Sequence, residues 1–129
     1  MPELPEVKTI QDQLNKVMPF KIETRSLSKV AGSIVHTKMD KLKGRTILAV
    51  NRKGKMLDFL LDDGRHILSH LGMTGTWLIS DTKIDEKHTH VQFKGDNGHL
   101  AYVDPRRFGH MYLYGKDDAE KKLGELGID

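Results

Sequence analysis

Reactive groups are concentrated in the first seven residues, MPELPEV, which place one secondary amine and two carboxylates at the start of the chain. If the initiator methionine is removed, Pro2 carries a free α-amine, and Glu3 and Glu6 follow it. An α-amine titrates near pH 8, so about a tenth of it is unprotonated and nucleophilic at neutral pH. If Met1 is retained, the proline nitrogen is an amide without this reactivity. The same residues also suit the start of a helix, which explains most of the segment without any chemistry.

Basic side chains surround a glycine in RKGKM, residues 52–56. A basic turn is commonly the solvated end of a hairpin. The functional interpretation is a contact with a phosphate group, with Lys55 presented from the edge of a strand. Both interpretations stay open, and Lys55 is the candidate residue.

Two further loops combine glycines with apolar or cationic side chains. In HLGMTG, residues 70–75, the glycines favour a tight hairpin turn, and Met73 is either exposed for binding or folded onto the core. In DPRRFG, residues 104–109, two arginines precede Phe108. Guanidinium groups bind phosphates or base edges, and an aromatic ring can insert between stacked bases. The alternative is a surface loop whose Phe108 points inward.

Two histidines alternate in KHTHV, and His88 and His90 are therefore expected to face the same side of a strand. A zinc site needs further ligands at a recognisable spacing, and the chain contains no cysteine. We interpret both histidines as structural and expect no metal or other cofactor in this chain.

A helix is predicted at the N-terminus, because apolar residues recur at steps of three and four: Val7, Ile10, Leu14, Val17 and Met18. Pro2 and Pro5 are expected in its first turn, where a missing N–H costs little. Short β-like runs follow at residues 20–28, 32–39, 45–54, 55–64, 65–72, 75–80, 88–95, 98–104 and 110–115. The turn signals DDG and GDNG separate hairpins. A second helix is predicted over residues 116–129, with Leu123 and Leu126 as its apolar contacts.

This pattern predicts a mostly β fold with flanking helices, as a two-layered antiparallel β-sandwich or a flattened barrel. With 129 residues the chain is one domain or a piece of one. No apolar run is long enough to span a bilayer, and the N-terminus lacks the features of a signal peptide, so we expect a cytoplasmic protein. The net charge of +3 is compatible with a polyanionic partner but is too small to argue for one.

Taken together, MPELPEV, RKGKM, HLGMTG, KHTHV and DPRRFG resemble the N-terminal half of formamidopyrimidine-DNA glycosylase, in order and spacing across essentially the whole chain. The related endonuclease VIII enzymes share the proline but usually have glycine where Leu4 stands. The resemblance implies a bacterial, nucleoid-associated repair enzyme that removes oxidised purines, such as 8-oxoguanine and formamidopyrimidines, from duplex DNA and then cuts the strand. It also implies that residues 1–129 form the glycosylase/lyase domain, a two-layered β-sandwich whose N-terminal helix carries the active-site proline.

The resemblance assigns catalytic roles near the N-terminus. Pro2 matches the nucleophile, Glu3 matches the residue that handles protons, and Glu6 matches a glutamate that supports the terminal helix and the site. Attack of the Pro2 amine on the deoxyribose C1′ gives, after ring opening, an iminium ion that acts as an electron sink. Elimination of the 3′ and then the 5′ phosphate, β,δ-elimination, follows. Glu3 can protonate the ring oxygen and later accept protons.

The resemblance also assigns contacts with DNA. Lys55 and His70 match residues that grip phosphates, and Arg107 matches a further backbone contact. Met73, Arg106 and Phe108 match a trio that fills the gap left by a flipped nucleotide, with Arg106 facing the orphaned cytosine. The damaged base must leave the stack to be reached, and the inserted side chains offset part of the cost of unstacking.

The family continues beyond this point with a helix–two-turns–helix module and usually a four-cysteine zinc finger, and neither is found in this sequence. We therefore expect a fragment or split gene product whose other half is supplied in cis or by another chain, and little or no glycosylase activity from this domain alone. Two alternatives stay open. One is a non-catalytic module that binds damaged or abasic DNA, and the other is a tautomerase that uses an N-terminal proline as a general base on small keto acids.

Overall fold

The first helix forms where the apolar periodicity predicts it. In the computed structural model, which describes residues 2–127, α1 spans Leu4–Asn15 and buries Val7 and Leu14. Glu3 is the N-cap residue, with an extended backbone at φ −80° and ψ 166°. The helix therefore begins after Pro2, and the prediction that Pro2 lies in the first turn is wrong. Pro5 does lie there, at a position where no amide hydrogen is needed.

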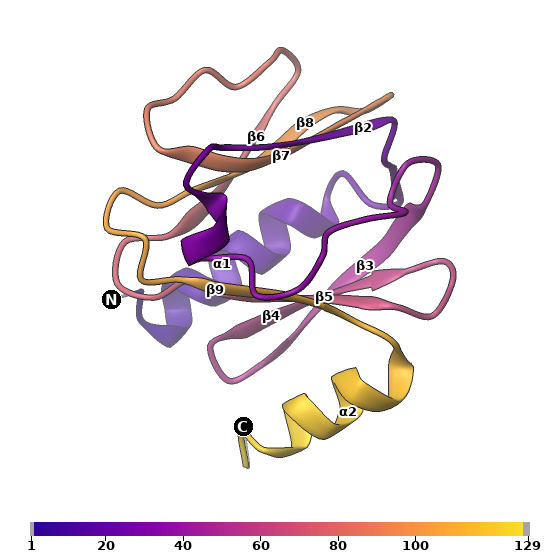
Figure 1. Ribbon diagram of the computed structural model, residues 1–129, viewed down its shortest axis with the longest axis vertical. Coiled ribbons are helices and arrows are strands. Elements are labelled where there is room, and N and C mark those ends of the chain that lie inside the picture. Colours follow the sequence, from indigo (N-terminus) through magenta and orange to yellow (C-terminus); the bar gives the residue numbers. More distant parts are fainter. Residues whose placement is uncertain (1, 128–129) are drawn as a thin grey trace.

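Within residues 2–127, nine strands form two antiparallel sheets that pack face to face (Figure 1). The first sheet has the order β1-β3-β4-β5-β9, with bounds Phe20–Lys21, Thr46–Lys53, Met56–Leu61, His66–His70 and His110–Tyr114. The second sheet has the order β2-β7-β8-β6, with bounds Thr24–Leu27, Thr89–Gly95, Gly98–Val103 and Thr76–Ser80. The predicted two-layered antiparallel sandwich with flanking helices is confirmed.

Aromatic side chains from both sheets fill the space between the layers. The Trp77 ring lies 4.9 Å from that of Phe59 across the interlayer space and 5.6 Å from that of Tyr102 on the neighbouring strand, measured between centroids. The Trp77 indole N–H donates to Ser69 Oγ at 3.0 Å, so its one polar atom is satisfied although the side chain is buried. Large rings with satisfied polar groups are effective at burying apolar area, and here they join the two sheets.

The loops divide into hairpins within a sheet and crossings between sheets. RKGKM joins β3 to β4, DDG joins β4 to β5, and GDNG joins β7 to β8, all as predicted. HLGMTG instead leads from β5 in the first sheet to β6 in the second, and DPRRFG returns from β8 to β9. The prediction that HLGMTG is a hairpin tip is therefore wrong, because its flanking strands pair with β9 and β8, not with each other.

Two predicted strands are corrected. The run at residues 20–28 changes sheets in its middle, since Ile22 N donates to Arg45 O whereas Glu23 N donates to Lys94 O. The run at residues 32–39 is not a strand. It begins within the 3₁₀ turn η1 (Ala31–Ser33), and its pairing with β9 is limited to one parallel bridge between Val35 and Met111.

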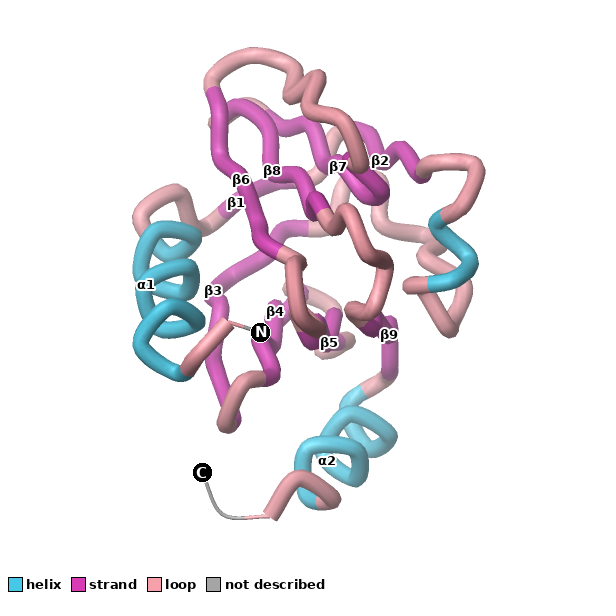
Figure 2. Tube along the Cα trace, turned by 90° about the vertical axis from the view of Figure 1, so that its left-hand side faces the viewer, coloured by secondary structure: helices cyan, strands magenta, loops and turns pink. Residues whose placement is uncertain are grey.

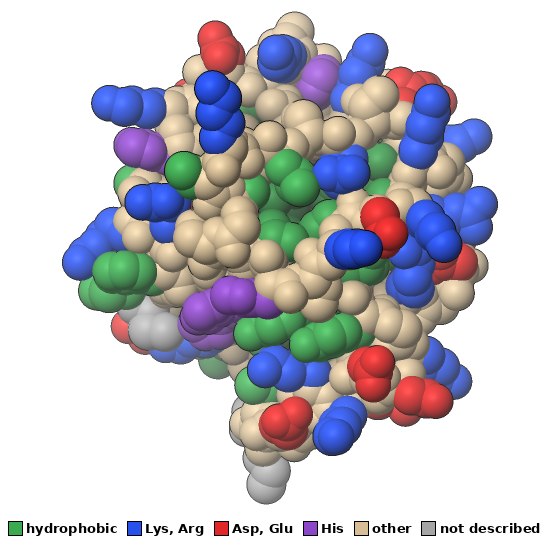
Figure 3. Space-filling view, in the orientation of Figure 1, with side chains coloured by type: hydrophobic (Ala, Val, Ile, Leu, Met, Phe, Trp, Pro, Cys, Tyr) green, Lys and Arg blue, Asp and Glu red, His purple; other side chains and the backbone are tan. Residues whose placement is uncertain are grey.

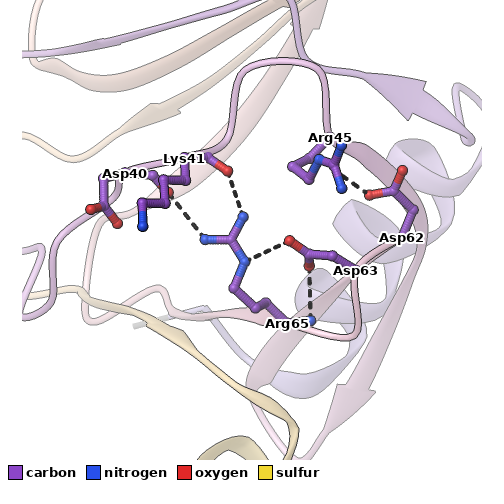
Figure 4. Close-up of polar contacts among 6 residues, drawn as sticks. All are labelled: Asp40, Lys41, Arg45, Asp62, Asp63 and Arg65. Carbon is purple, nitrogen blue, oxygen red and sulfur yellow. Dashed lines mark hydrogen bonds and ion pairs between the residues drawn. The ribbon is translucent and has the colours of Figure 1, made fainter.

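Residues 40 and 41 are held against the β4–β5 turn by the Arg65 guanidinium group (Figure 4). Arg65 donates from Nη1 to Asp40 O at 3.1 Å and from Nη2 to Lys41 O at 2.5 Å. Its Nε donates to Asp63 Oδ2 at 2.8 Å, which fixes the guanidinium plane. The backbone oxygens of Asp40 and Lys41 therefore bond to a side chain.

The helices cover two different parts of the sandwich (Figure 2). α1 lies along the side formed by β3 and β6, whereas α2 (Lys116–Gly124) packs on β5 and β9. Ala119 is the buried residue of α2, Leu123 is half-buried, and Leu126 lies beyond the helix and is 43% exposed. The predicted contact through Leu126 is therefore wrong, and residues 128 and 129 of the predicted helix lie outside the described part. Across residues 2–127, neither helix has the length and apolar character needed to cross a bilayer.

Candidate catalytic and nucleic-acid-binding site

The chain terminus is tied to the β3–β4 turn. Glu3 N donates to Glu6 Oε2 at 2.8 Å, and Glu3 Oε2 lies 3.5 Å from Lys55 Nζ. These contacts bring Glu3, Glu6 and Lys55 together immediately beside Pro2. The Glu3 and Lys55 side chains are 69% and 34% exposed, so their ion pair adds little stability. Its importance is positional, because it places a cation and a carboxylate next to the proline.

The position of α1, and with it the position of Pro2, is set by hydrogen bonds to the backbone of β3. Asn15 Nδ2 donates to Val50 O at 2.8 Å, and Val50 N donates to Asn15 Oδ1 at 2.9 Å. Gln11 Nε2 also donates to Val50 O, at 3.1 Å. Sequence reasoning missed this anchor, because an asparagine near a helix end is an ordinary polar residue in the sequence.

Asp104 joins the two loops that cross between the sheets. Its Oδ1 accepts hydrogen bonds from Thr74 Oγ1 at 2.7 Å and from Arg107 N at 3.0 Å. Its Oδ2 accepts from Tyr102 OH at 2.8 Å and from Gly109 N at 2.9 Å. The carboxylate is fully buried, and all four donors come from the β5–β6 loop, β8 or the β8–β9 loop. In the sequence Asp104 is only the first residue of DPRRFG, and no local pattern marks it as the residue that joins two loops.

The electrostatics of this cluster favour the charged carboxylate. Burial by itself would raise the pKa of Asp104, but the hydrogen bonds from Thr74, Tyr102 and the loop amides outweigh it and lower that pKa below its usual value. Burial, followed by the bond to Asp104, raises the pKa of Tyr102, so its hydroxyl stays protonated as a donor. The crossing loops are thus held by the ionised Asp104 carboxylate, and each of its two oxygens accepts two hydrogen bonds.

Two glycines allow the crossing loops to touch. Gly72 has φ +61°, and a Cβ there would lie 2.5 Å from Phe108 C. A Cβ on Gly109 would collide with the Tyr102 hydroxyl and lie 2.9 Å from Asp104 Oδ2. The missing side chain at Gly72 lets the β5–β6 loop touch the β8–β9 loop, and the missing side chain at Gly109 lets the β8–β9 loop lie against Tyr102 and Asp104.

The crossing loops present apolar and cationic side chains to solvent. Met73 is 45% exposed and Phe108 is 48% exposed, so neither folds onto the core. The Arg106 guanidinium carbon lies 4.8 Å from the centroid of the Phe108 ring, a cation–π distance. Arg107 is exposed and has φ 56°, a strained value that is held in part by the hydrogen bond from its backbone N–H to Asp104 Oδ1.

His70 stands at the end of β5, between these loops and Lys55. Its Nδ1 accepts a hydrogen bond from Gly72 N at 3.1 Å, so the neutral ring carries its proton on Nε2. Burial, His110 and Lys55 lower the pKa of His70, which favours this neutral form at pH 7. The ring can therefore donate one hydrogen bond in a fixed direction.

The two histidines of KHTHV do not act as a pair. His90 is buried, with Nδ1 2.8 Å from Ser28 Oγ and Nε2 2.9 Å from Asp104 O, whereas His88 is exposed, has φ 68° and precedes β7. The expectation that they face one side of a strand is wrong, because His88 lies before β7 with a left-handed backbone and only His90 is in the strand. Within residues 2–127 no group of three or more side chains is arranged to hold a metal ion.

The predicted site residues gather at one end of the sandwich. The N-terminus, the β3–β4 turn and both crossing loops lie on the left of Figure 1, and the β4–β5 turn lies at the opposite end. The N-terminus brings Pro2, Glu3 and Glu6 to this end, the β3–β4 turn brings Lys55, and the crossing loops bring Met73, Arg106, Arg107 and Phe108. Met1, whose removal would free the proline amine, lies outside the described residues.

Comparison with known proteins shows which family shares this sequence and this fold. A sequence profile of the formamidopyrimidine-DNA glycosylase N-terminal domain matches residues 1–111. The chain belongs to the formamidopyrimidine-DNA glycosylase family. Curated relatives with that name include those of Mycoplasma genitalium, 36% identical over 136 residues, and Oceanobacillus iheyensis, 40% identical over 139 residues. Each alignment covers 100% of this chain, 48% of the first relative and 49% of the second. The chain thus spans about half the length of the curated relatives it matches.

Solved structures of formamidopyrimidine-DNA glycosylases share the fold. The Lactococcus lactis enzyme bound non-covalently to DNA containing an abasic site superposes with a TM-score of 0.86 and is 31% identical, over 96% of this chain and 49% of that chain. The same enzyme bound to DNA containing N7-benzyl-Fapy-dG also gives a TM-score of 0.86, at 33% identity over 96% of this chain and 48% of that chain. The sandwich is therefore the N-terminal domain fold of this DNA-repair family, seen in relatives that hold damaged DNA.

Proposed function

We propose that this chain is the nucleophile-bearing half of a bifunctional DNA glycosylase/AP lyase that acts on oxidised purines in duplex DNA. The observation that carries the proposal is the juxtaposition of Pro2, Glu3 and Lys55 at the end of the sandwich that also presents the crossing loops. Base loss and strand cleavage require a nucleophile, a group that transfers protons and a cation that balances the phosphate charge.

In the proposed reaction the Pro2 amine attacks the deoxyribose C1′ of the flipped nucleotide. The C1′–N bond to the damaged base breaks, and the base leaves with the bonding electrons and a proton. Glu3 protonates the ring oxygen, the ring opens, and an iminium ion forms between Pro2 and C1′. Loss of a C2′ proton to a base then expels the 3′ phosphate, and a second elimination expels the 5′ phosphate. Lys55 balances phosphate charge beside Glu3.

The crossing loops supply the proposed wedge. Met73 and Phe108 are apolar, exposed and adjacent through the Gly72–Phe108 contact, so they can occupy the space that a flipped nucleotide leaves. Arg106 lies over Phe108 and can move with it to the edge of the unpaired base. Arg107 and His70 are proposed to bind the DNA backbone on either side of the wedge.

We further propose that residues beyond this half contribute most of the grip on DNA, from the same polypeptide or from a partner chain. This chain alone is then expected to bind damaged duplex weakly and to release little or no 8-oxoguanine. Turnover of an 8-oxoguanine duplex at a rate close to that of a full-length relative would contradict this expectation.

The test is borohydride trapping on an abasic-site duplex, performed on chain whose intact mass shows that Met1 has been removed. A covalent adduct located on the N-terminal peptide is expected, because reduction of the iminium ion links Pro2 to C1′. The matched control is the chain with one extra residue before Pro2, which turns the amine into an amide and leaves the fold intact.

The outcomes separate the candidate functions. An adduct in the trimmed chain that is missing in the extended chain supports the lyase proposal. Duplex binding without any adduct in either chain would instead identify a non-catalytic module that recognises abasic DNA. Turnover of an enol substrate without DNA would support a tautomerase.

A further inference from the structure

Three histidines form a row beside the proposed phosphate contacts, although only His70 was singled out by the sequence. His110 is the first residue of β9 and pairs in register with His70, the last residue of β5, so both side chains stand on the outer face of the first sheet. Their ring centroids are 6.3 Å apart. His36 adjoins His110 on the far side, with centroids 4.9 Å apart. Figure 3 shows the resulting histidine group on the surface over β9.

The row of His70, His110 and His36 lies next to the charged groups beside the proposed nucleophile, Pro2. Glu3 contacts Lys55 at the β3–β4 turn, and Met56, the residue after Lys55, pairs in register with His70. The next strand contributes His110, which lies two residues after Phe108 of the crossing loop. Polar groups therefore run from the N-terminus across the end of the first sheet, directly beside the proposed wedge.

His36 fixes the orientation of the His110 ring. His36 Nε2 lies 2.7 Å from His110 Nδ1, so the two rings share one hydrogen. When His36 Nε2–H donates, His110 Nδ1 is the acceptor and His110 carries its own proton on Nε2. His36 is itself held by its backbone N–H, which donates to Met111 O at 2.9 Å, and by the Tyr112 ring at 5.3 Å between centroids.

We propose that His110, oriented by His36, is a phosphate-binding residue that contacts the DNA backbone next to the phosphate bound by His70. The inference rests on the proposed function, since it names a further contact for the same DNA strand. His36 is a positioning residue, because it acts through the ring of His110. Both His70 and His110 then present an Nε2–H donor fixed by a bond to Nδ1, at neighbouring points on the sheet.

A metal site does not fit the same residues. The nitrogens of His36 and His110 that face each other are already joined by a hydrogen bond, and no three-ligand group is found in the described part of the chain. A phosphate accepts hydrogen bonds from imidazole groups without displacing that bond.

The contact is expected to depend on pH. His110 is faced by His36, His70 and Lys122, and burial followed by the charges of His36 and Lys122 lowers its pKa from the usual 6.5. At pH 8 the ring is a neutral donor. In acid, a bound phosphate favours the imidazolium form, so His110 then adds a full charge to the interface.

The experiment measures binding of a duplex that contains an abasic-site analogue, by fluorescence anisotropy at several salt concentrations, at pH 8 and pH 5.5. His110→Val keeps a strand-compatible side chain and removes the donor. At pH 8 it should weaken binding about threefold to tenfold, the value of one neutral hydrogen bond, with no change in the slope of log K against log salt. At pH 5.5 it should also reduce the magnitude of that slope by up to about 0.9, the contribution of one phosphate contact.

The matched control is His99→Val, the same change on β8 in the second sheet, which should alter neither quantity. Equal binding by wild type and His110→Val at both pH values would overturn the inference. A separate readout uses ¹⁵N NMR of the imidazole nitrogens without DNA, where His110 should carry its proton on Nε2. Protonation on Nδ1 would also overturn it. Failure of the wild-type chain to bind the duplex would instead contradict the proposed function, and the inference with it.

Discussion

The buried carboxylate of Asp104 stabilises the fold because each of its oxygens accepts two hydrogen bonds. Its oxygens accept four hydrogen bonds from two hydroxyls and two amides, all within 3.0 Å. A buried carboxylate without partners would be strongly unfavourable, so these donors and the carboxylate depend on one another. The consequence is that the shape of both crossing loops rests on a single side chain.

We predict that Asp104→Asn lowers the free energy of unfolding by about 3 kcal/mol, because the amide group cannot accept from all four donors. Urea denaturation of the variant and the wild type measures this difference. Asp81→Asn, at an exposed position, is the control and should lie within about 0.5 kcal/mol of wild type. Equal stability of wild type and Asp104→Asn would mean that the cluster does not hold the loops.

The same carboxylate gives a pH dependence with a definite sign. Its pKa in the folded state is lowered from 3.8, so its stabilising effect is fully present above about pH 4 and is lost as the pH falls through the lowered value. The stability difference between wild type and Asp104→Asn should therefore be constant from pH 7 to pH 5 and shrink below about pH 4. Denaturation curves at a series of pH values test this, and a difference that grows on acidification would contradict it.

At the scale of elements, the crossing loops need close contact as well as hydrogen bonds. We predict that Gly109→Ala destabilises the protein by about 1–3 kcal/mol, because the new methyl group collides with the Tyr102 hydroxyl. Gly32→Ala is the matched control, since a Cβ there meets only open space and the position does not cap a helix. Thermal melting of both variants should show a clear loss for the first and almost none for the second. Similar melting curves would show that the loops can separate without cost.

Helix α1 is the element that delivers the proline. We predict that Asn15→Ala lowers stability by about 1–2 kcal/mol, as two hydrogen bonds to the Val50 backbone are lost. It should also reduce borohydride trapping more than the fall in folded fraction explains, because the start of the helix moves relative to Lys55. Gln13→Ala, at an exposed position of the same helix, should change neither measurement. Trapping that follows the folded fraction alone would refute the positional role.

At the scale of the whole molecule, we predict how strongly binding of the duplex depends on salt concentration. Lys55 and Arg107 are the cations that we propose to bind phosphate groups. Each phosphate contact adds about 0.9 to the magnitude of the salt slope, so a slope of about −2 is expected at pH 8. Arg107→Gln should reduce that magnitude by about 1, whereas Arg25→Gln on β2 should leave it unchanged. Titration of the duplex at several salt concentrations measures both. An equal effect of the two changes would indicate diffuse attraction by the net charge of +3 and not a defined site.

The sequence predicted the helix, most strands and the sandwich because these depend on local periodicity and turn residues. Prediction from the sequence failed where contacts between residues distant in the chain determine the backbone conformation. Residues 32–39 alternate like a strand, yet side chains such as Thr37, whose hydroxyl accepts from Leu113 N, replace the ladder there. Met73 and Phe108 could be identified as candidates because they stand beside glycines in local motifs. Asp104, Asn15 and His110 were missed because no local pattern marks them. Asn15 and His110 bond to residues 35 and 74 positions away in the chain, and Asp104 joins its own loop to Thr74, 30 positions away.

The arrangement of the interlayer aromatic residues has a practical consequence for spectroscopy. Trp77 is the sole tryptophan of the chain, and it lies buried between the sheets at the second residue of β6, close to the end of the β5–β6 loop. Its emission therefore reports on the apolar interior, and a red shift follows separation of the layers. Because the indole is shielded from solvent, a DNA base cannot stack on it, so one intrinsic fluorophore follows unfolding while a label on the duplex follows binding.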